Sequence, residues 1–423
     1  MNFFRPLIEQ SINRSREATI SILGVHDSGL RQHLMEQMSS VLGEEGCFLA
    51  NPVFEHTFGW EPSGRTLADV KGGLLSHTLV DKLSRAEGYE LQNPYSHQLQ
   101  AWQELVQNPP KSVVITSGTG SGKTECFMVP ILDDLIREYQ QTNEPLVGVR
   151  ALFLYPLNAL INSQKERLHA WTKDFGSNIR FCLYNGNTKE SASSVRQLQS
   201  ETPNQILSRE LLRQDPAPIL MTNATMLEYM LVRQIDSPIL EISKEAQSLR
   251  WIVLDEAHTY VGSQAAELSL LLRRVIHAFG KKADQIRFIA TSATIADPNA
   301  YKRLQQYLAD LAGVKLEQVV VIGGSRVIPD VSHHAPTNTL TLDKIQQIDH
   351  SKDVSVSRFE ALKSNYLAQT IRHYIVSQGK PSELRDIIGI VSSSLQAKDL
   401  QGRQREVLDW LDLMTGTRAT ENS

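Results

Sequence analysis

The sequence predicts an α/β fold with a mostly parallel sheet, flanked by helical regions toward both ends of the chain. Short apolar segments alternate with longer helical segments between residues 91 and 330. The apolar segments have the composition of strands buried on both faces, which is typical of parallel sheets covered by helices. Polar signatures follow several of these segments directly, and ligands bind at the carboxyl ends of the strands in such sheets.

Seven segments are expected to be strands, and these short apolar segments alternate with longer helical segments. They are SVVIT (112–116), ALFLY (151–155), RFCLY (180–184), PILMT (218–222), WIVLD (251–255), RFIAT (287–291) and QVVVI (318–322). We therefore assign residues 91–330 to one α/β domain.

The two flanking regions have a helical pattern instead. In residues 1–90, apolar residues recur at helical spacing near Leu7 and again near Leu34, between irregular Gly- and Pro-rich stretches. In residues 331–423 the strand pattern stops, and helices are expected over 359–377, 383–394 and 403–414. We interpret both regions as accessory. A helix-turn-helix DNA reader is the alternative for the tail, although short helices joined by a Gly turn are common in helical bundles.

Composition excludes several classes of protein. The 423 residues carry a formal net charge of −4, with 41% hydrophobic and 21% charged residues. This is an ordinary globular composition. It excludes a strongly basic nucleic-acid coat but not a local basic groove, because net charge does not describe how charge is distributed. Arg233, Arg250, Arg273 and Arg274 are candidates for such a groove. The alternative for Arg273 and Arg274, which lie on an expected helix, is a solvated face or salt bridges.

Cysteine usage points to a reducing compartment, and hydropathy gives no sign of a membrane-spanning segment. The three cysteines are far apart and form no CxxC pair, which excludes a zinc knuckle or a disulfide framework. No apolar run approaches the ~20 residues of a membrane span, and charged residues interrupt the first 20 residues. We expect a cytoplasmic protein without a membrane partner.

A glycine-rich segment between the strand 112–116 and the helical segment 125–139 has the pattern of a phosphate-binding loop. Glycines let the backbone approach phosphate oxygens, and the helix N-terminus adds positive potential. Lys123 is expected to reach the β- and γ-phosphates of ATP, and Thr124 to bind Mg²⁺. Ser117 departs from the strict pattern, which has Gly there, and the alternative is a plain Gly-rich turn. The expected nucleotide-binding residues are Ser117, Gly118, Thr119, Gly120, Ser121, Gly122, Lys123 and Thr124.

An acidic pair follows the strand 251–255. Asp255 closes the strand on the same sheet as the glycine-rich loop, which suits a second Mg²⁺ contact made directly or through water. Glu256 is placed to orient or deprotonate an attacking water. Lys123, Asp255 and Glu256 are therefore the expected catalytic residues. His258 is not expected to bind metal, because no second His or Cys lies near it in the sequence.

Together these segments resemble the superfamily 2 DEAD/DEAH-box helicases. Tyr95-Ser-His-Gln98 resembles the adenine-reading element of that family, with Gln98 contacting the base, and Ser292-Ala-Thr294 resembles motif III, which links hydrolysis to strand movement. The resemblance implies a RecA-like lobe that uses ATP and Mg²⁺, with His258, Ser292 and Thr294 in the coupling. MLEYMLVR (226–233), DEAHTYVGSQAAELSLLLRRV (255–275) and ATSATIADP (290–298) resemble more narrowly the large bacterial helicases of the YprA type. Relatives of that type act in DNA repair and anti-phage defence.

The resemblance also implies contacts with a single nucleic-acid strand. Residues 155–160 and 222–228 resemble motifs Ia and Ib, which hold strand phosphates, and residues 184–188 resemble a loop between them. Asn158 and Asn223 also suit helix N-caps, and Gly186 suits a turn. The resemblance leans to DNA over RNA. The expected strand contacts are Asn158, Gly186, Thr188, Thr222 and Asn223.

A helicase of this superfamily needs a second RecA-like lobe, whose arginine fingers stabilise the transition state. No second alternation of strands and helices follows residue 322. We therefore expect one motor lobe, completed by a second lobe in a longer protein or on a partner chain, and weak hydrolysis without it. The alternatives are a non-catalytic module that binds nucleotide or strand and docks a partner, and a phosphate-loop ATPase outside the helicases. The intact Lys123, Thr124, Asp255 and Glu256 count against the first alternative.

Overall fold

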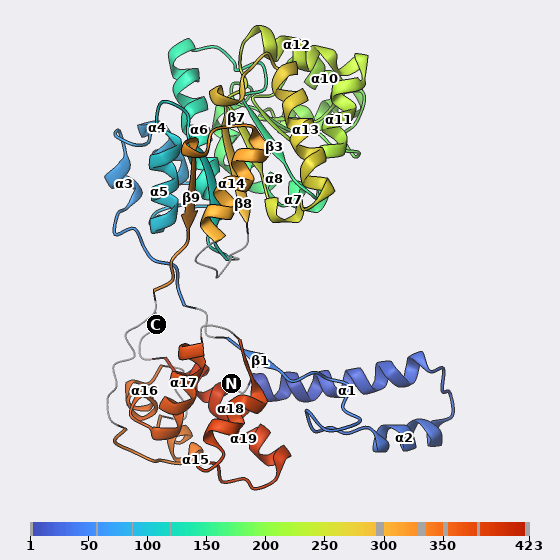
Figure 1. Cartoon of the computed structure of the whole chain (residues 1–423), viewed down its shortest axis with the longest axis vertical. Coiled ribbons are helices and arrows are strands. Elements are labelled where there is room, and N and C mark those ends of the chain that lie inside the picture. Colours follow the sequence, from blue (N-terminus) through green and yellow to red (C-terminus); the bar gives the residue numbers. More distant parts are fainter. Residues whose placement is uncertain are drawn as a thin grey trace. The chain divides into compact units, whose positions relative to one another are not determined.

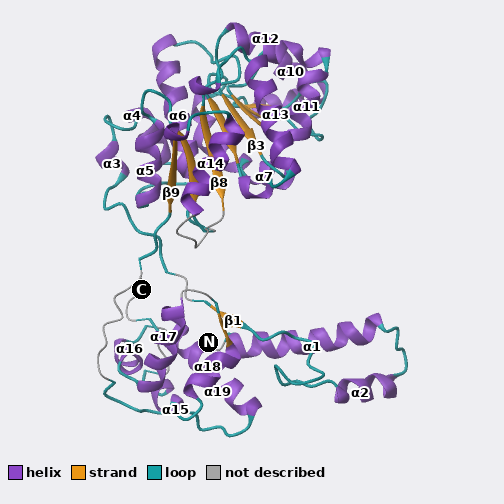
Figure 2. Cartoon of the chain, in the orientation of Figure 1, coloured by secondary structure: helices purple, strands orange, loops and turns teal. Residues whose placement is uncertain are grey.

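A computed structural model of the chain describes residues 3–55, 58–86, 88–118, 120–292, 300–327, 336–349, 354–378 and 381–418. The chain divides into two compact units. One unit is continuous, residues 59–327, and the other combines residues 1–58 with residues 328–423. Figures 1 and 2 show the sheet in the first unit and the mainly helical second unit. No helix in the described ranges is both long and apolar enough to span a bilayer.

The unit of residues 59–327 is built on one sheet of eight strands. The neighbours run in the order β5-β4-β6-β3-β7-β8-β2-β9, and every pairing is parallel. The seven predicted strands are all present, and the fold class is confirmed. The eighth, β5, has two residues and is too short to leave a hydrophobic pattern. The strands are β2 (Ser112–Thr116), β3 (Ala151–Leu154), β4 (Phe181–Leu183), β5 (Gln205–Ile206), β6 (Ile219–Thr222), β7 (Trp251–Leu254), β8 (Arg287–Ser292) and β9 (Val319–Gly323).

Helices cover both faces of this sheet, so both faces of each central strand are buried. In β2, Val113 and Ile115 face one hydrophobic core, whereas Val114 faces the other. The first core is closed by α3 (Leu67–Val70), α4 (His77–Leu83), α5 (Ser96–Leu105), α6 (Lys123–Thr142), α7 (Asn158–Ser163) and α8 (Lys165–Thr172). The second core is closed by α10 (Arg209–Gln214), α11 (Ala224–Val232), α12 (Ser237–Glu245), α13 (Ser263–Ala278) and α14 (Ala300–Ala312). A short helix, α9 (Arg196–Glu201), precedes β5.

The unit boundaries differ from the regions read in the sequence. Residues 59–90, grouped there with the N-terminal region, belong to the same unit as the sheet. The physical reason is that Leu79 and Leu83 of α4 are fully buried in the core that also contains Leu105 of α5. Local periodicity identifies such helices but not the core that buries them.

The second unit joins segments from the two ends of the sequence. Val53 pairs with Glu383, and Phe54 with Ser382, in a two-stranded antiparallel ladder. Ile12 and Leu42 share a core with Leu408. The elements of this unit are α1 (Phe4–Ile22), α2 (Ser28–Gln37), β1 (Val53–Phe54), α15 (Leu342–Gln346), α16 (Val356–Lys363), α17 (Tyr366–Gln378), β10 (Ser382–Glu383), α18 (Leu384–Val391) and α19 (Leu400–Gly416).

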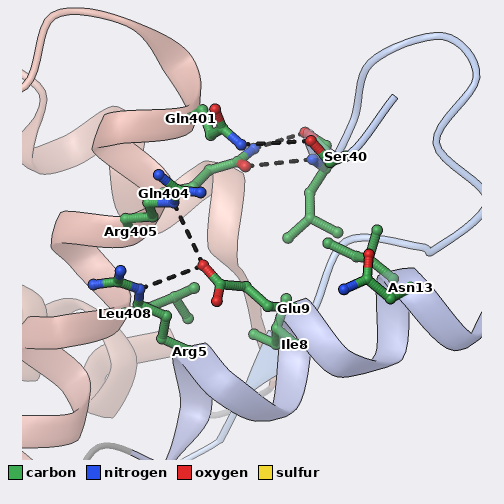
Figure 3. A pocket seen from close by; sticks show the side chains of 11 residues that line it. Arg5, Ile8, Glu9, Asn13, Ser40, Gln401, Gln404, Arg405 and Leu408 are labelled. Atoms are coloured by element: carbon green, nitrogen blue, oxygen red, sulfur yellow. Dashed lines mark hydrogen bonds and ion pairs between the residues drawn. The ribbon is translucent and has the colours of Figure 1, made fainter. Parts of the chain in front are cut away.

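A cavity of about 250 Å³ lies between α1, residues 40–42 and α19 of this unit. Figure 3 shows that Glu9 approaches two arginines there: its Oε1 lies 3.4 Å from Nε of Arg5 and 3.5 Å from Nε of Arg405. Gln404 both donates to and accepts from the backbone of Leu42. These polar contacts bind the N-terminal segment to the last helix.

Candidate nucleotide and strand site

The glycine-rich loop leaves β2 and opens α6, as the sequence predicts. The Nζ atom of Lys123 donates to the carbonyl oxygen of Ser117 at 2.9 Å, and the hydroxyls of Ser117 and Ser121 lie 2.6 Å apart. Gly120 and Gly122 both have φ of 71°, a left-handed backbone that favours glycine. The loop therefore curls around its own lysine. Thr119 lies outside the described residues.

Helix α5 holds this loop from the side. Nε2 of His97 donates to the carbonyl of Ser121 at 2.8 Å, and burial lowers the pKa of the ring, so the neutral form is favoured. Nε2 of Gln98 donates to the carbonyl of Gly122 at 3.1 Å, while its Oε1 accepts from the backbone N–H of Tyr95 at 2.9 Å. Gln98 is thus next to the loop. His97 was missed in the sequence, although it directly precedes Gln98.

The acidic pair follows β7, and both of its residues are hydrogen-bonded to Thr291 of the neighbouring strand β8. The hydroxyl of Thr291 donates to Oδ1 of Asp255 and accepts from the backbone N–H of Glu256 at 2.9 Å. Burial raises the pKa of Asp255, while the Thr291 hydrogen bond and the charge of Lys123 oppose that shift. Glu256 has φ of 50°, an uncommon conformation for a residue with a side chain. Thr291 lies one residue before the triplet identified in the sequence and was missed.

His258, Ser292 and Thr294 are the remaining predicted residues at this edge of the sheet. Nδ1 of His258 lies 3.3 Å from Oε2 of Glu256, and the His258 side chain is exposed. Ser292 closes β8, and its carbonyl accepts from the backbone N–H of Ser117 at 3.4 Å. Its buried hydroxyl has no hydrogen-bond partner among the described residues. Thr294 lies outside the described residues.

An open cavity of about 670 Å³ adjoins the glycine-rich loop, a volume typical of small-molecule sites. Lys123, Thr124 and Glu256 line it from the loop and the acidic pair. On the other side it is lined by Tyr95, Gln98 and the segment 90–93. The residues expected to bind phosphate and the residue expected to contact the base thus line one cavity.

Glu125 and Arg167 also line this cavity and were not identified in the sequence. Their side chains form an ion pair at 3.2 Å. Arg167 belongs to α8 and lies over the ring of Trp171 at 5.9 Å. The sequence gives no local sign that Arg167 lies beside the glycine-rich loop, because it belongs to a separate helix. Glu125 could have been identified only from its position directly after Thr124.

The donor set near Lys123 fits a magnesium ion bound together with nucleotide phosphates. Thr124 offers a hydroxyl and Asp255 a carboxylate, which are the hard oxygen ligands that Mg²⁺ takes. In the described part of the chain, no group of three or more His, Cys, Asp or Glu residues is placed to hold a metal ion. Mg²⁺ in nucleotide sites usually takes one or two protein oxygens and keeps water and substrate phosphates as its other ligands.

The predicted strand contacts gather at the carboxyl ends of β3, β4 and β6, which are neighbours in the sheet. Asn223 is the N-cap of α11 and accepts from the backbone N–H of Met226 at 2.8 Å. Its Nδ2 donates to Oδ1 of Asn158 at 2.8 Å, and Asn158 is exposed. The N-cap alternative therefore holds for Asn223, whereas the N-cap of α7 is Leu157.

The other three strand candidates differ in exposure. The hydroxyl of Thr222 is buried and donates to the carbonyl of Tyr184 at 2.7 Å. The hydroxyl of Thr188 donates to the carbonyl of Leu183 at 2.6 Å, which closes a turn. Gly186 is exposed, and a side chain there would meet no atom within 4 Å. In this conformation the two threonine hydroxyls serve the fold.

The considered basic face does not include all four arginines. Arg250 precedes β7 and is ion-paired to Asp134 at 2.9 Å and Glu138 at 2.6 Å. It therefore lies at the opposite end of that strand from Asp255. Arg274 pairs loosely with Glu228, at 3.7 Å, with both side chains about half exposed. Arg250 therefore does not contribute to the basic groove considered from the sequence, because Asp134 and Glu138 neutralise its charge.

Comparison with known proteins identifies relatives of this chain. Residues 95–302 match the DEAD/DEAH box helicase family. Druantia protein DruE of Escherichia coli (strain UMEA 4076-1) is 26% identical over 390 residues, covering 71% of this chain and 21% of that protein. The uncharacterized ATP-dependent helicase YprA of Bacillus subtilis (strain 168) is 30% identical over 271 residues, covering 63% of this chain and 30% of that protein.

A yeast helicase is also similar. ATP-dependent helicase hrq1 of Schizosaccharomyces pombe is 27% identical over 272 residues, covering 63% of this chain and 22% of that protein. The chain thus spans less than a third of each of these three relatives. Among solved structures, the DUF1998 helicase MrfA bound to DNA aligns with a TM-score of 0.45 at 22% identity, covering 78% of this chain and 42% of that chain.

Proposed function

The chain carries a DEAD/DEAH box helicase domain, and from that premise we propose that residues 59–327 are the ATP-binding motor lobe of a DNA helicase or translocase. The observation that supports it best is the convergence of Lys123, Thr124 and Glu256 on one cavity. Lys123 supplies positive charge at the loop, and Glu256 supplies a base. These are the parts that phosphoryl transfer from ATP to water requires.

Each residue has a distinct role in the proposed reaction. The Lys123 ammonium exchanges the Ser117 carbonyl for β- and γ-phosphate oxygens. Thr124 and Asp255 would hold Mg²⁺, which would supply positive charge to neutralise the phosphates. Glu256 orients the attacking water and accepts its proton. The Thr291 hydroxyl bonds both to the backbone N–H of Glu256 and to the carboxylate of Asp255, and so fixes the position of one relative to the other.

The proposed lobe acts on a single DNA strand at the carboxyl ends of β3, β4 and β6. Asn158, Gly186 and Asn223 are exposed or partly exposed there. Backbone and amide donors at helix N-termini favour strand phosphates over bases, so we propose binding without sequence preference. We propose DNA as the substrate, and a role in DNA repair or anti-phage defence, because residues 226–233, 255–275 and 290–298 resemble YprA-type helicases, whose relatives act in those processes.

We further propose that a second RecA-like lobe, in a longer protein or on a partner chain, completes the motor. The described residues after β9 form α15 to α19 and the two-residue β10, which pack with α1 and β1. They do not form a second parallel sheet. Since a second-lobe arginine finger is worth about 10³–10⁵ in rate, the chain alone should hydrolyse ATP slowly.

Two variants test the assignment in the assembled enzyme. Lys123→Ala should abolish Mg²⁺–ATP binding, and Glu256→Gln should retain binding but abolish turnover, because the amide no longer accepts a proton. Calorimetric binding and phosphate release measure the two steps separately. Arg196→Ala, at an exposed position on α9, is the matched control. Full activity of either site variant would refute the assignment.

A further inference from the structure

Two segments from the two ends of the 59–327 unit meet beside the glycine-rich loop. Trp60 and Arg326 form an antiparallel bridge. The backbone N–H of Glu61 donates to the carbonyl of Ser325 at 2.9 Å, and that of Val327 to the carbonyl of Gly59 at 3.0 Å. The chain enters this unit at residue 59 and leaves it at residue 327. Both connections to the rest of the chain therefore start from one short ladder.

The side chains of this bridge form a stack that reaches the loop. The guanidinium carbon of Arg326 lies 4.0 Å from the ring centroid of Trp60, well within cation–π range. The Trp60 ring also meets His97 edge-on, with centroids 5.7 Å apart. Because Nε2 of His97 donates to the carbonyl of Ser121, Trp60 touches a residue that holds the loop.

Two glycines show how closely the stack and the loop approach each other. A Cβ atom on Gly118 would lie 3.3 Å from Nη2 of Arg326 and 3.4 Å from the ring of Trp60. A Cβ atom on Gly324 would lie 2.8 Å from Cβ of Ser117 and 2.9 Å from the Trp60 ring, closer than packed carbons come. Neither glycine has a left-handed backbone. Gly324 is therefore required for space, whereas a side chain at Gly118 would need Arg326 or Trp60 to shift by a few tenths of an ångström.

Ser117, the departure from the strict loop pattern, is part of this packing. Gly324 donates its backbone N–H to the carbonyl of Thr116 at 2.9 Å, which draws the segment after β9 onto the end of β2. The Cβ of Ser117 occupies the space that Gly324 leaves without a side chain. The first residues of the loop are thus fitted to the segment that carries Arg326.

We propose that Trp60 and Arg326 are positioning residues for the ATP site. Their stack fixes Ser117 and Gly118 in the shape that receives phosphate, and the guanidinium adds positive potential beside the loop. This proposal rests on nucleotide binding at the loop, as proposed above. It also makes the ladder at residues 59–61 and 325–327 responsive to nucleotide, because the ladder and the loop share the same packed residues.

The test uses the intact chain, fluorescent Mg²⁺–ATP as the probe, and thermal unfolding to confirm that each variant is folded. Arg326→Ala and Trp60→Leu should each weaken binding roughly 3- to 10-fold, the scale of one cation–π contact. Trp60→Phe keeps an aromatic face and should restore most of the affinity. Arg196→Ala, an exposed arginine on α9, should bind as the wild type does.

A second readout separates positioning from simple stabilisation of the fold. Nucleotide should change the tryptophan emission of the wild type, and the change should be largely lost in Trp60→Phe. The other four tryptophans remain in that variant as an internal control. If Arg326→Ala and Trp60→Leu bind within twofold of the wild type while Lys123→Ala does not bind, the positioning role of Trp60 and Arg326 is refuted and the proposed function stands. If the wild type itself binds no Mg²⁺–ATP, both are refuted.

Discussion

A single hydroxyl, that of Thr291, connects the two acidic residues of the site. It donates to Asp255 and accepts from the backbone of Glu256, and Thr291 is fully buried. Valine has the same shape without the hydroxyl, so Thr291→Val should leave both groups without this partner. We expect a loss of about 1–3 kcal/mol in the free energy of unfolding and a fall in ATP turnover. Urea denaturation and phosphate release by the assembled enzyme measure the two effects.

Thr291→Ser is the matched control, because it retains the hydroxyl and removes only a methyl group. It should recover most of the turnover and most of the stability. If Thr291→Val hydrolyses ATP at the wild-type rate, the hydroxyl does not position the acidic pair, and Asp255 and Glu256 must be held by other contacts.

Asp255 makes stability depend on pH in a defined direction. Burial raises its pKa in the folded chain, so this carboxyl contributes stability at low pH that is lost as pH rises through the folded-state pKa. At neutral pH its charge therefore costs stability. Asp255→Asn keeps an oxygen for Thr291 and removes the charge, so it should melt at a higher temperature than the wild type at pH 7.5.

Thermal melts of the wild type and Asp255→Asn between pH 4 and 8 check this prediction. The difference in melting temperature should shrink as pH falls, because the wild-type carboxyl becomes protonated. The variant should also lose ATP turnover, because the buried carboxylate lowers the stability of the fold but is needed for activity. A lower melting temperature of the variant at pH 7.5 would contradict the burial effect.

At the scale of elements, the N-terminus of α11 serves both the fold and the proposed strand site. Asn223 caps the helix through its Oδ1 and reaches Asn158 through its Nδ2. Asn223→Ala should cost about 1 kcal/mol of stability through the lost cap. Asn223→Asp keeps the cap but places a carboxylate where strand phosphates are proposed to bind, so its stability should be retained and its affinity for single-stranded DNA should fall.

Chemical denaturation and fluorescence anisotropy with a labelled oligonucleotide separate the two effects. Anisotropy should be recorded with Mg²⁺–ATP present and at fixed salt, because phosphate contacts depend strongly on ionic strength. If Asn223→Asp binds DNA as tightly as the wild type, Asn223 is a cap alone, and the strand path lies elsewhere on this edge.

The sequence predicts elements well where they are long or buried and poorly where they are short. Strand β2 was predicted with its observed bounds, because five consecutive residues are buried. Strand β5 has two residues, and β10 also has two, so neither produces a periodic pattern. The predicted helix over 359–377 is two helices, α16 and α17, because Ser364 and Asn365 interrupt it.

The sequence predicts those residues of the candidate site that lie in short contiguous motifs. Lys123, Asp255 and Glu256 follow strands within short motifs, and the structure places Lys123 and Glu256 on one cavity. Other residues near the site come from separate elements: Thr291 from β8, Arg167 from α8 and Arg326 from the segment after β9. Their roles depend on tertiary packing, which a single sequence does not encode in any local spacing.

At the scale of the whole molecule, the two ends of the sequence are parts of one unit. Asp412 of α19 is buried and accepts from the backbone N–H groups of Phe3 at 2.8 Å and Phe4 at 2.7 Å. It therefore caps α1 from a position about 400 residues away. Sequence reading separated these regions, because long-range capping leaves no pattern within either segment.

Asp412→Ala should destabilise this unit selectively. The loss of the cap leaves first-turn N–H groups of α1 without their partner, at a cost of about 2 kcal/mol. Because the 59–327 unit has its own cores, Mg²⁺–ATP affinity should not change. Differential scanning calorimetry should show one transition shifted and the other in place. Asp412→Asn, which keeps one acceptor, should show a smaller shift, and an equal shift of both transitions would contradict the independence of the units.

The most direct test of the account is ATP hydrolysis by the intact chain, measured with and without single-stranded DNA alongside Mg²⁺–ATP binding. We predict binding that Lys123→Ala abolishes, with slow turnover that DNA does not raise, because the second-lobe arginines are not supplied. Addition of the second lobe should then raise turnover strongly. Fast, DNA-stimulated hydrolysis by the chain alone would contradict the proposal that it is one lobe of a two-lobe motor.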